Sequence, residues 1–148
     1  METERLIIRE MVPEDVDQIY DLYAHPDITL YMEPLFENRE EEKEYMVSYY
    51  DHVYCFFGYG MWLITLKDGT IIGRAGLEHN EKEEVVAGYM LAKEYQKCGY
   101  ALEAMKAILE YAREELDIHQ VIAYIQIENI DSLRLAEKLG LTIKDIQT

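Results

Sequence analysis

Residues 85–105 constrain the fold of this chain most, because they read as an apolar strand, a short turn and a helix. The run Val-Val-Ala-Gly-Tyr-Met-Leu at residues 85–91 has the composition of a buried strand. After the turn, apolar side chains recur at helical spacing, at Leu102, Met105, Ile108, Leu109 and Ala112. Gly99 and Ala101 keep the start of this helix free of bulk. The first N–H groups of a helix have no partner within it and lie at its positive end, so the junction predicts a phosphate site.

The first half of the sequence predicts helices and an antiparallel hairpin. Residues 6–9 read as a short strand, and a helix is expected to start near Pro13, where acidic residues favour the helix dipole. A second helix is expected over residues 40–50. A Lys-Asp-Gly-Thr turn then separates β-forming runs at residues 62–66 and 71–77, which predicts two antiparallel strands.

The second half predicts a parallel crossover. Residues 121–125 read as the next strand, and a strand, helix and strand of this length imply a right-handed parallel connection. A last helix is expected over residues 130–139, with Gly140 as its stop, and a final short strand over residues 142–146. The expected fold class is α+β: a mixed sheet, antiparallel first and parallel later, with helices on both faces. A chain of 148 residues predicts a single domain over residues 1–148.

Charge narrows the class of partner. The formal net charge is −16, which repels phosphate backbones and attracts amines and cationic peptides over a Debye length of about 8 Å. We therefore expect no nucleic-acid partner, and the charge serves either solubility or the steering of a basic substrate. Lys93 and Lys97, beside the predicted phosphate turn, would offset this field for an anionic ligand.

No apolar run approaches the roughly 20 residues of a membrane span, and the acidic amino terminus lacks the pattern of a signal peptide. A cytoplasmic protein with no membrane partner is therefore expected. The two cysteines, Cys55 and Cys98, show no paired spacing, which argues against a disulfide framework. We expect no metal site, because the histidines lie far apart in the sequence, at His25, His52, His79 and His119.

Two segments carry a resemblance to a known family. Residues 96–101, Gln-Lys-Cys-Gly-Tyr-Ala, resemble the Q/R-x-x-G-x-G/A acetyl-coenzyme A signature of the GNAT N-acetyltransferases. Residues 128–141 resemble the E-N-x-x-S-x-x-x-x-E-K-L-G-F segment of the branch that acetylates ribosomal-protein N-termini. The two motifs stand in the expected order, joined by a helix and a strand. The resemblance implies a GNAT-like sheet and direct transfer of an acetyl group from acetyl-coenzyme A, as co-substrate, to a primary amine.

The resemblance also implies which residues bind the coenzyme. Backbone N–H groups of residues 87–89 would polarise the thioester carbonyl, as an oxyanion hole does, and residues 96–101 would wrap the diphosphate. Asn129 would hydrogen-bond the pantetheine arm. The expected coenzyme-binding residues are Ala87, Gly88, Tyr89, Met90, Leu91, Gln96, Lys97, Cys98, Gly99, Tyr100, Ala101, Asn129 and Ser132. The commoner Q-G-K-G-Y-A form has a glycine at position 97 and a basic residue at position 98. This chain has Lys97 and Cys98 instead, so it keeps one positive charge but carries it one residue earlier.

The catalytic residues follow less directly. Ser132 matches the hydroxyl proposed in this branch to protonate the departing thiolate, and the tyrosine that many family members use one turn later is Ala136 here. Ser132 and Asn129 would instead merely cap the helix if they had no catalytic role. The position often occupied by a glutamate base is Val86, which leaves Glu78, Glu33, a water chain or His79 to accept the proton of the amine.

Two alternatives to the acetyltransferase interpretation remain, and the sequence also indicates an amine pocket and a possible homodimer. Missing catalytic groups at positions 86 and 136 are consistent with a catalytically silent acyl-coenzyme A binding or interaction module. Cys98 beside Lys97 at a helix start is a second alternative, as a reactive thiol. Tyrosines of the first two helices and their connection would line the amine pocket, namely Tyr23, Tyr31, Tyr49, Tyr50 and Tyr54, together with Met32. The last strand of the family's sheet has no counterpart after residue 146, so we expect an open sheet edge or a homodimer.

Overall fold

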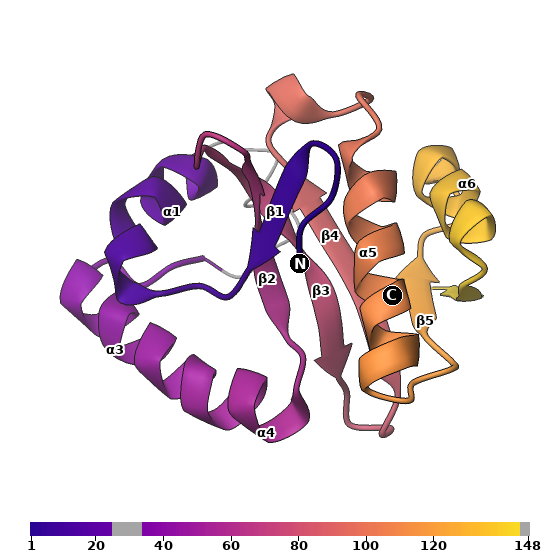
Figure 1. The fold of residues 1–148 in the computed structure, drawn as a ribbon, viewed down its shortest axis with the longest axis horizontal. Helices are drawn as coiled ribbons and strands as arrows, with labels where there is room; N and C mark the ends of the chain where they lie inside the picture. Colours follow the sequence, from indigo (N-terminus) through magenta and orange to yellow (C-terminus); the bar gives the residue numbers. More distant parts are fainter. Residues whose placement is uncertain (25–33, 146–148) are drawn as a thin grey trace.

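A computed structural model describes residues 1–24 and 34–145 of the chain, and these residues build one six-stranded sheet flanked by helices (Figure 1). The strands are β1 (Leu6–Arg9), β2 (Met61–Leu66), β3 (Ile71–His79), β4 (Val85–Leu91), β5 (Ile122–Ile125) and β6 (Thr142–Asp145). The helices are α1 (Val16–Tyr23), α3 (Arg39–Tyr49), α4 (Cys55–Phe57), α5 (Tyr100–Glu115) and α6 (Ile130–Leu139). Short turns η1 (Pro13–Asp15), η2 (Tyr50–Tyr54) and η3 (Lys93–Tyr95) complete the elements.

The sheet follows the order of the sequence, β1-β2-β3-β4-β5-β6. The first four strands pair antiparallel, whereas β4 with β5 and β5 with β6 pair parallel. The mixed α+β sheet predicted from the sequence is therefore confirmed. The Asp68-Gly69 turn forms the predicted hairpin, because Thr70 N donates to Asp68 Oδ1 (2.9 Å) and Gly69 adopts a φ of +94°.

Strand register assigns side chains to the two faces of the sheet. Trp62, Ala75 and Tyr89 lie opposite one another on neighbouring strands, and the Trp62 ring meets Tyr111 of α5 edge-on, with centroids 6.0 Å apart. This face is therefore covered by α5 and, beside it, α6 (Figure 1). Arg74, which neighbours Ala75, points to the other face and donates to the hydroxyl of Tyr23 on α1 (2.9 Å). Helices α1 and α3 cover that second face.

Apolar side chains are buried on both faces of the sheet. Helix α5 buries the predicted apolar stripe through Met105, Ile108 and Ala112, while Leu102 and Leu109 are half-buried. Helix α1 buries Ile19 and Leu22. None of the helices in the described ranges combines the length and the hydropathy of a membrane span.

Element boundaries differ modestly from those expected. Proline 13 opens a 3-10 turn rather than α1 itself, and β3 continues two residues beyond the expected Leu77, to His79. Helix α6 and its left-handed Gly140 stop lie where the sequence places them. The final strand ends at Asp145 within the described residues, and Ile146, which the prediction included, lies outside them.

The second helix expected over residues 40–50 is present as α3, Arg39–Tyr49. Helix α3 ends at Tyr49 and continues as the π-helical turn η2, whose wider winding adds a residue to the turn. Tyr54 thereby enters the core at 4% exposure, and its hydroxyl donates to Met61 O (2.6 Å), whereas Tyr50 remains 42% exposed. The helix predicted from the sequence ends at residue 50 and does not include this turn.

Candidate functional site

A cleft opens where strands β4 and β5 separate. The two strands are paired at Val86 and Ile122. Beyond that pair a cavity of about 920 Å³ lies between them, lined by residues 87–91 of β4 and by residues 123–126 of β5 and the position after it. The start of α5 and one side of α6 complete its walls. A cavity of this size lies within the usual range for small-molecule and cofactor sites.

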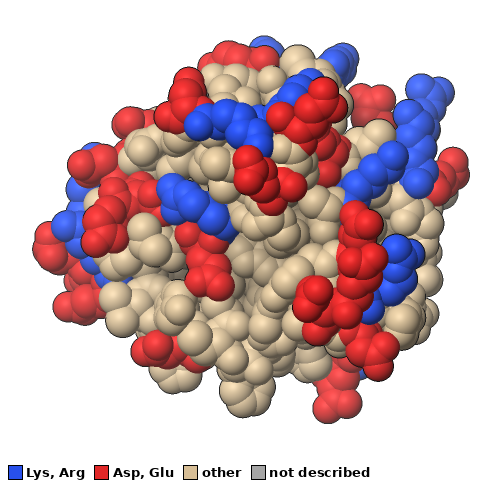
Figure 2. All heavy atoms as spheres, viewed as in Figure 1, with Lys and Arg blue, Asp and Glu red and all other residues tan. Residues whose placement is uncertain are grey.

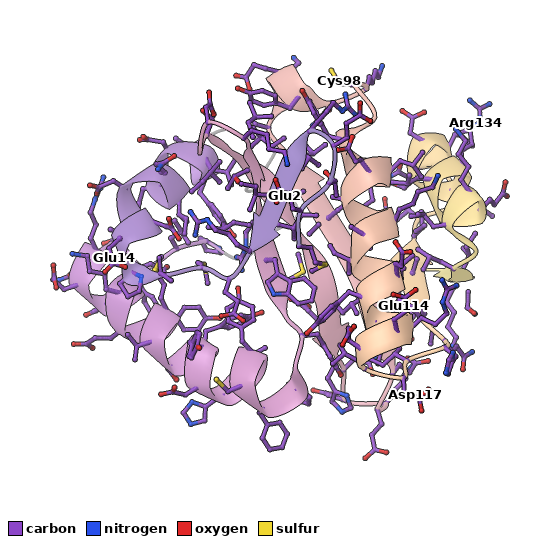
Figure 3. All side chains as sticks on the ribbon, viewed as in Figure 1. Glu2, Glu14, Cys98, Glu114, Asp117 and Arg134 are labelled. Atoms are coloured by element: carbon purple, nitrogen blue, oxygen red, sulfur yellow. The ribbon has the colours of Figure 1, made fainter. Side chains whose placement is uncertain are left out.

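The cavity gathers most of the residues expected to bind the coenzyme. Twelve of the thirteen line it: Ala87, Gly88, Tyr89, Met90, Leu91, Gln96, Lys97, Gly99, Tyr100, Ala101, Asn129 and Ser132. Cys98 is the exception, because it is exposed and projects from the turn that precedes α5 (Figure 3). Two segments some thirty residues apart in sequence thus face one hollow.

The turn before α5 has a geometry suited to an anion. Gly99 is the N-terminal cap of α5 with a φ of +84°, and its carbonyl accepts the N–H of Glu103 (3.1 Å). Lys97 also has a positive φ, of +62°. Residues 99–102 line the cavity, and the first N–H groups of a helix have no partner within it and lie at its positive end, which favours a negative ligand there. Gln96 secures the turn by donating from Nε2 to Leu91 O (3.0 Å).

Basic side chains surround this cavity despite the acidic composition. Lys97, Arg134 and Lys138 line it, together with one acid, Asp131. Figure 2 shows acidic groups over much of the visible face, and Figure 3 labels Arg134 on the α6 side, where basic groups gather in Figure 2. The local charge can therefore oppose the net charge of −16 and favour an anion in the cleft.

A contact that the sequence analysis did not anticipate clamps the same turn. Arg5 lies just before β1, and its Nη1 donates to Cys98 O (3.0 Å) while its Cζ lies 4.3 Å from the centroid of the Tyr100 ring. Its Nε also donates to Glu103 Oε1 (2.7 Å). Partial burial opposes ionisation of Glu103, but hydrogen bonds from Thr3 and Arg5 hold the pKa of this carboxyl below its usual range. No local pattern signals the clamp, because its partners are 98 residues apart.

The start of α6 presents Asn129 and Ser132 to the cavity. Asn129 Oδ1 accepts the N–H of Ser132 (3.2 Å), so Asn129 caps the helix as its residue type predicts. This capping leaves the amide NH₂ of Asn129 for a ligand. Ser132 Oγ lies 3.1 Å from the hydroxyl of Tyr89, a contact that the sequence analysis also missed. Ala136, one turn later, is 2% exposed and offers no hydroxyl.

Of the candidates for a base, the described residues include Glu78 and His79, both at the end of β3. Glu78 lies opposite Val86 in the β3–β4 register and is exposed, on the face covered by α1 and α3. Glu33, the other candidate, lies outside the described residues, as do Tyr31 and Met32 of the predicted amine pocket. His79 stacks on Phe57, with ring centroids 5.1 Å apart.

Glu84 is a further carboxylate near the start of β4. Lys144 Nζ (2.6 Å), Asn80 Nδ2 (2.9 Å) and the Tyr124 hydroxyl all donate to it. The Lys144 ammonium, followed by these hydroxyl and amide donors, lowers the pKa of Glu84 to about 2. Glu84 therefore stays ionised at neutral pH and is a fixed charge rather than a base.

Three of the tyrosines expected to line the amine pocket, Tyr23, Tyr49 and Tyr54, lie around the side chain of Arg74. Arg74 donates to the Tyr23 hydroxyl (2.9 Å) and to Met61 O (3.1 Å), and Tyr54 is 4% exposed. The Tyr49 hydroxyl accepts the N–H of Met61 (2.9 Å). These rings therefore build the core under α1 and α3. Within residues 1–24 and 34–145, no group of three or more His, Cys, Asp or Glu side chains is placed to hold a metal ion.

Comparison with known proteins points to one family. Residues 5–142 match the model of the acetyltransferase (GNAT) domain. The uncharacterized N-acetyltransferase YnaD of Bacillus subtilis is 29% identical over 141 residues, which span 94% of this chain and 80% of that protein.

Two solved structures share the fold. A Bordetella pertussis protein described as a GnaT-family acetyltransferase has a TM-score of 0.79 at 22% identity, over 94% of this chain and 86% of its own. Spermidine N-acetyltransferase of Vibrio cholerae, solved with CoA and spermine, has a TM-score of 0.72 at 22% identity, over 93% and 81% of the two chains.

Proposed function

The chain belongs to the GNAT acetyltransferase family, and from this premise we propose that it transfers the acetyl group of acetyl-coenzyme A to a primary amine. The observation that carries the proposal is the cavity between β4, β5, α5 and α6, which gathers two sequence motifs on one surface. We also propose that residues 1–148 form one domain, because every described strand joins the same sheet.

Binding of the coenzyme uses the two ends of the cleft. The diphosphate lies on the N–H groups that begin α5, with Lys97 beside them, and Gly99 keeps this approach open. The pantetheine arm runs along β4 toward α6, where Asn129 donates from its amide NH₂. The thioester then lies near Gly88, and backbone N–H groups of residues 87–89 polarise its carbonyl.

The reaction is a direct displacement at the thioester carbonyl. The neutral amine attacks the carbonyl carbon, a C–N bond forms, and the negative oxygen of the tetrahedral intermediate is stabilised by the backbone N–H groups of β4. The C–S bond then breaks, and the sulfur receives a proton from Ser132. A free thiol has a pKa of about 8.5, so the leaving thiolate needs only modest help.

The proton of the amine needs an acceptor on the other face of β4. Glu78 lies on that face, opposite Val86 in the β3–β4 register. Glu33 and a water chain are the alternatives. An aliphatic ammonium has a pKa near 10, so this deprotonation is the more demanding proton transfer of the two.

The acceptor is proposed to be a cationic amine. The net charge of −16 attracts cations to the molecule, while the basic groups of the cleft retain the coenzyme. The spermidine N-acetyltransferase of similar fold, solved with spermine, makes polyamines the first compounds to test.

A silent acyl-coenzyme A binding module is the second candidate function. It is favoured by Ala136 and Val86, which lack the hydroxyl and the carboxylate common at these positions in the family. Calorimetry with acetyl-coenzyme A, followed by thiol release with a panel of polyamines, amino acids and peptides, separates the two. Binding with turnover supports the enzyme, binding without turnover on any amine supports the module, and absence of binding contradicts both.

A further inference from the structure

Four hydroxyl-bearing side chains line the cleft: Tyr89, Tyr100, Tyr124 and Ser132. Two of them are engaged elsewhere. The Tyr100 ring lies against the Arg5 guanidinium at the phosphate end, and the Tyr124 hydroxyl donates to Glu84. The oxygens of Tyr89 and Ser132 remain, and they lie 3.1 Å apart.

The fold brings these two hydroxyls together from separate elements. Tyr89 follows Gly88 on β4, and its pairing with Ala75 turns its half-buried ring toward α5 and α6. Ser132 lies in the first turn of α6, where Asn129 holds its N–H. Because a paired strand fixes one partner and a capped helix turn fixes the other, the contact is organised before any ligand binds.

We propose that Tyr89 is a positioning residue for catalysis, which orients Ser132 and supplies the proton that Ser132 passes to the departing thiolate. This inference rests on the proposed acetyl transfer. It also accounts for Ala136: the helix offers no hydroxyl one turn after Ser132, and the strand provides a phenol from the opposite wall of the cleft.

The acidities of the groups favour this arrangement. A phenol has an ordinary pKa of about 10 and a thiol of about 8.5, whereas an aliphatic hydroxyl is a far weaker acid than either. Serine alone would have to deliver a proton and carry the resulting charge. With Tyr89 beside it, that charge resides on the phenol oxygen.

The proton balance is complete within the proposed reaction. As the C–S bond breaks, the Ser132 proton bonds to the sulfur while the Tyr89 proton moves to Ser132 Oγ. The phenolate takes a proton back from solvent, which has received the one lost by the attacking amine. The products are the acetamide and the free thiol of coenzyme A, and the protein returns to its starting state.

The test measures the acidity of the coenzyme A thiol while it is bound. Ultraviolet absorbance of the thiolate is followed against pH for the wild type, Tyr89→Phe, Ser132→Ala, the double variant and Tyr111→Phe. Tyr111→Phe is the matched control, because it removes a phenol hydroxyl from α5 outside the cleft residues. The charged groups facing the cleft, Lys97, Asp131, Arg134 and Lys138, are unchanged in every variant.

We expect Tyr89→Phe and Ser132→Ala each to raise the pKa of the bound thiol by about one unit, because a donor to the thiolate is weakened or lost. Since Tyr89 acts through Ser132, the double variant is expected to shift no further than Ser132→Ala alone. With an amine that supports turnover, Tyr89→Phe is expected to lower kcat roughly tenfold and to leave KM for acetyl-coenzyme A unchanged.

Two failures are distinguishable. If no protein, wild type included, binds coenzyme A in calorimetry, the proposed function itself falls. If all bind it equally and the thiol of the Tyr89→Phe complex titrates as in the wild type, only the role of Tyr89 is wrong. Equal shifts from Tyr89→Phe with and without Ser132 would also contradict the proposal, because Tyr89 would then act independently.

Discussion

The Nε atom of Arg5 lies 2.7 Å from Oε1 of Glu103, and this ion pair ties the segment before β1 to the first turn of α5. The same guanidinium donates to the carbonyl of Cys98, within the predicted diphosphate turn. The amino-terminal segment therefore supports a site whose residues lie some ninety positions later in the chain.

Removal of this clamp is expected to weaken coenzyme binding. Arg5→Ala frees the Cys98 carbonyl and removes a cation beside the turn, so calorimetry is expected to show a roughly fivefold weaker affinity for coenzyme A. The melting temperature is expected to change little, because the Arg5 side chain that is removed is 42% exposed. Lys67→Ala is the matched control, since it breaks the exposed Lys67–Glu2 pair (2.6 Å) away from the turn. Equal affinities of the two variants would contradict the clamp.

A side chain at position 99 is expected to disturb the diphosphate site. Gly99 has a φ of +84°, and an added Cβ would lie 3.2 Å from Nη2 of Arg5. We expect Gly99→Ala to cost about 1 kcal/mol of stability and to weaken coenzyme A binding roughly tenfold or more. Gly69→Ala bears the same backbone strain at a φ of +94°, in a hairpin turn with no atom within 4 Å of the added Cβ. Its affinity should match the wild type, and an equal loss in both variants would assign the effect to stability alone.

The loss of folding stability at acidic pH is expected to depend on Glu84. Its pKa is lowered from 4.5 to about 2 in the folded chain, chiefly by Lys144 and then by Tyr124 and Asn80. Because the folded value lies below the unfolded one, the ionised group stabilises the fold above about pH 4.5, and this contribution is lost as the pH falls toward about 2.

Urea unfolding at several pH values tests this expectation. Glu84→Gln should be less stable than the wild type at neutral pH, and the difference should shrink as the pH falls from about 4.5 to about 2. Glu81→Gln, in the same turn, should follow the wild type throughout. A gap between Glu84→Gln and the wild type that stays constant down to pH 2 would argue against the ionised cluster.

Replacement of Glu78 tests its role as the base. With an amine that supports turnover, we expect Glu78→Gln to lower kcat by roughly a hundredfold and to leave coenzyme A affinity unchanged. Glu81→Gln again serves as the control, because it removes an exposed carboxylate between β3 and β4. Activity of Glu78→Gln equal to that of the control would transfer the role to Glu33 or to a water chain.

Local patterns predicted the elements around the site well. The strand, turn and helix of residues 85–105 follow from a contiguous apolar run, from Gly99 and from helical spacing, all of which are short-range signals. The bounds of α6 follow from Asn129 at its start and Gly140 at its end. The sequence predicted thirteen coenzyme-binding residues, and twelve of them line one cavity.

Contacts between distant segments could not be predicted in the same way. Strand alternation indicates which face Tyr89 occupies, but the meeting with Ser132 depends on how α6 packs. Glu84 reads as part of a charged turn, and its low pKa arises from Lys144 on β6. The π-helical turn places Tyr54 in the core, which removes it from the expected amine pocket. The fold of one chain does not test the expected homodimer or the expected cytoplasmic location, and both stay predictions.

A crystal structure of the chain grown with coenzyme A tests the central claim most directly. We predict density for the ligand between β4 and β5, with its diphosphate on the backbone N–H groups that begin α5 and its thiol near the hydroxyls of Tyr89 and Ser132. Density for the bound coenzyme at any other surface, with the β4–β5 cleft holding only solvent, would contradict the account.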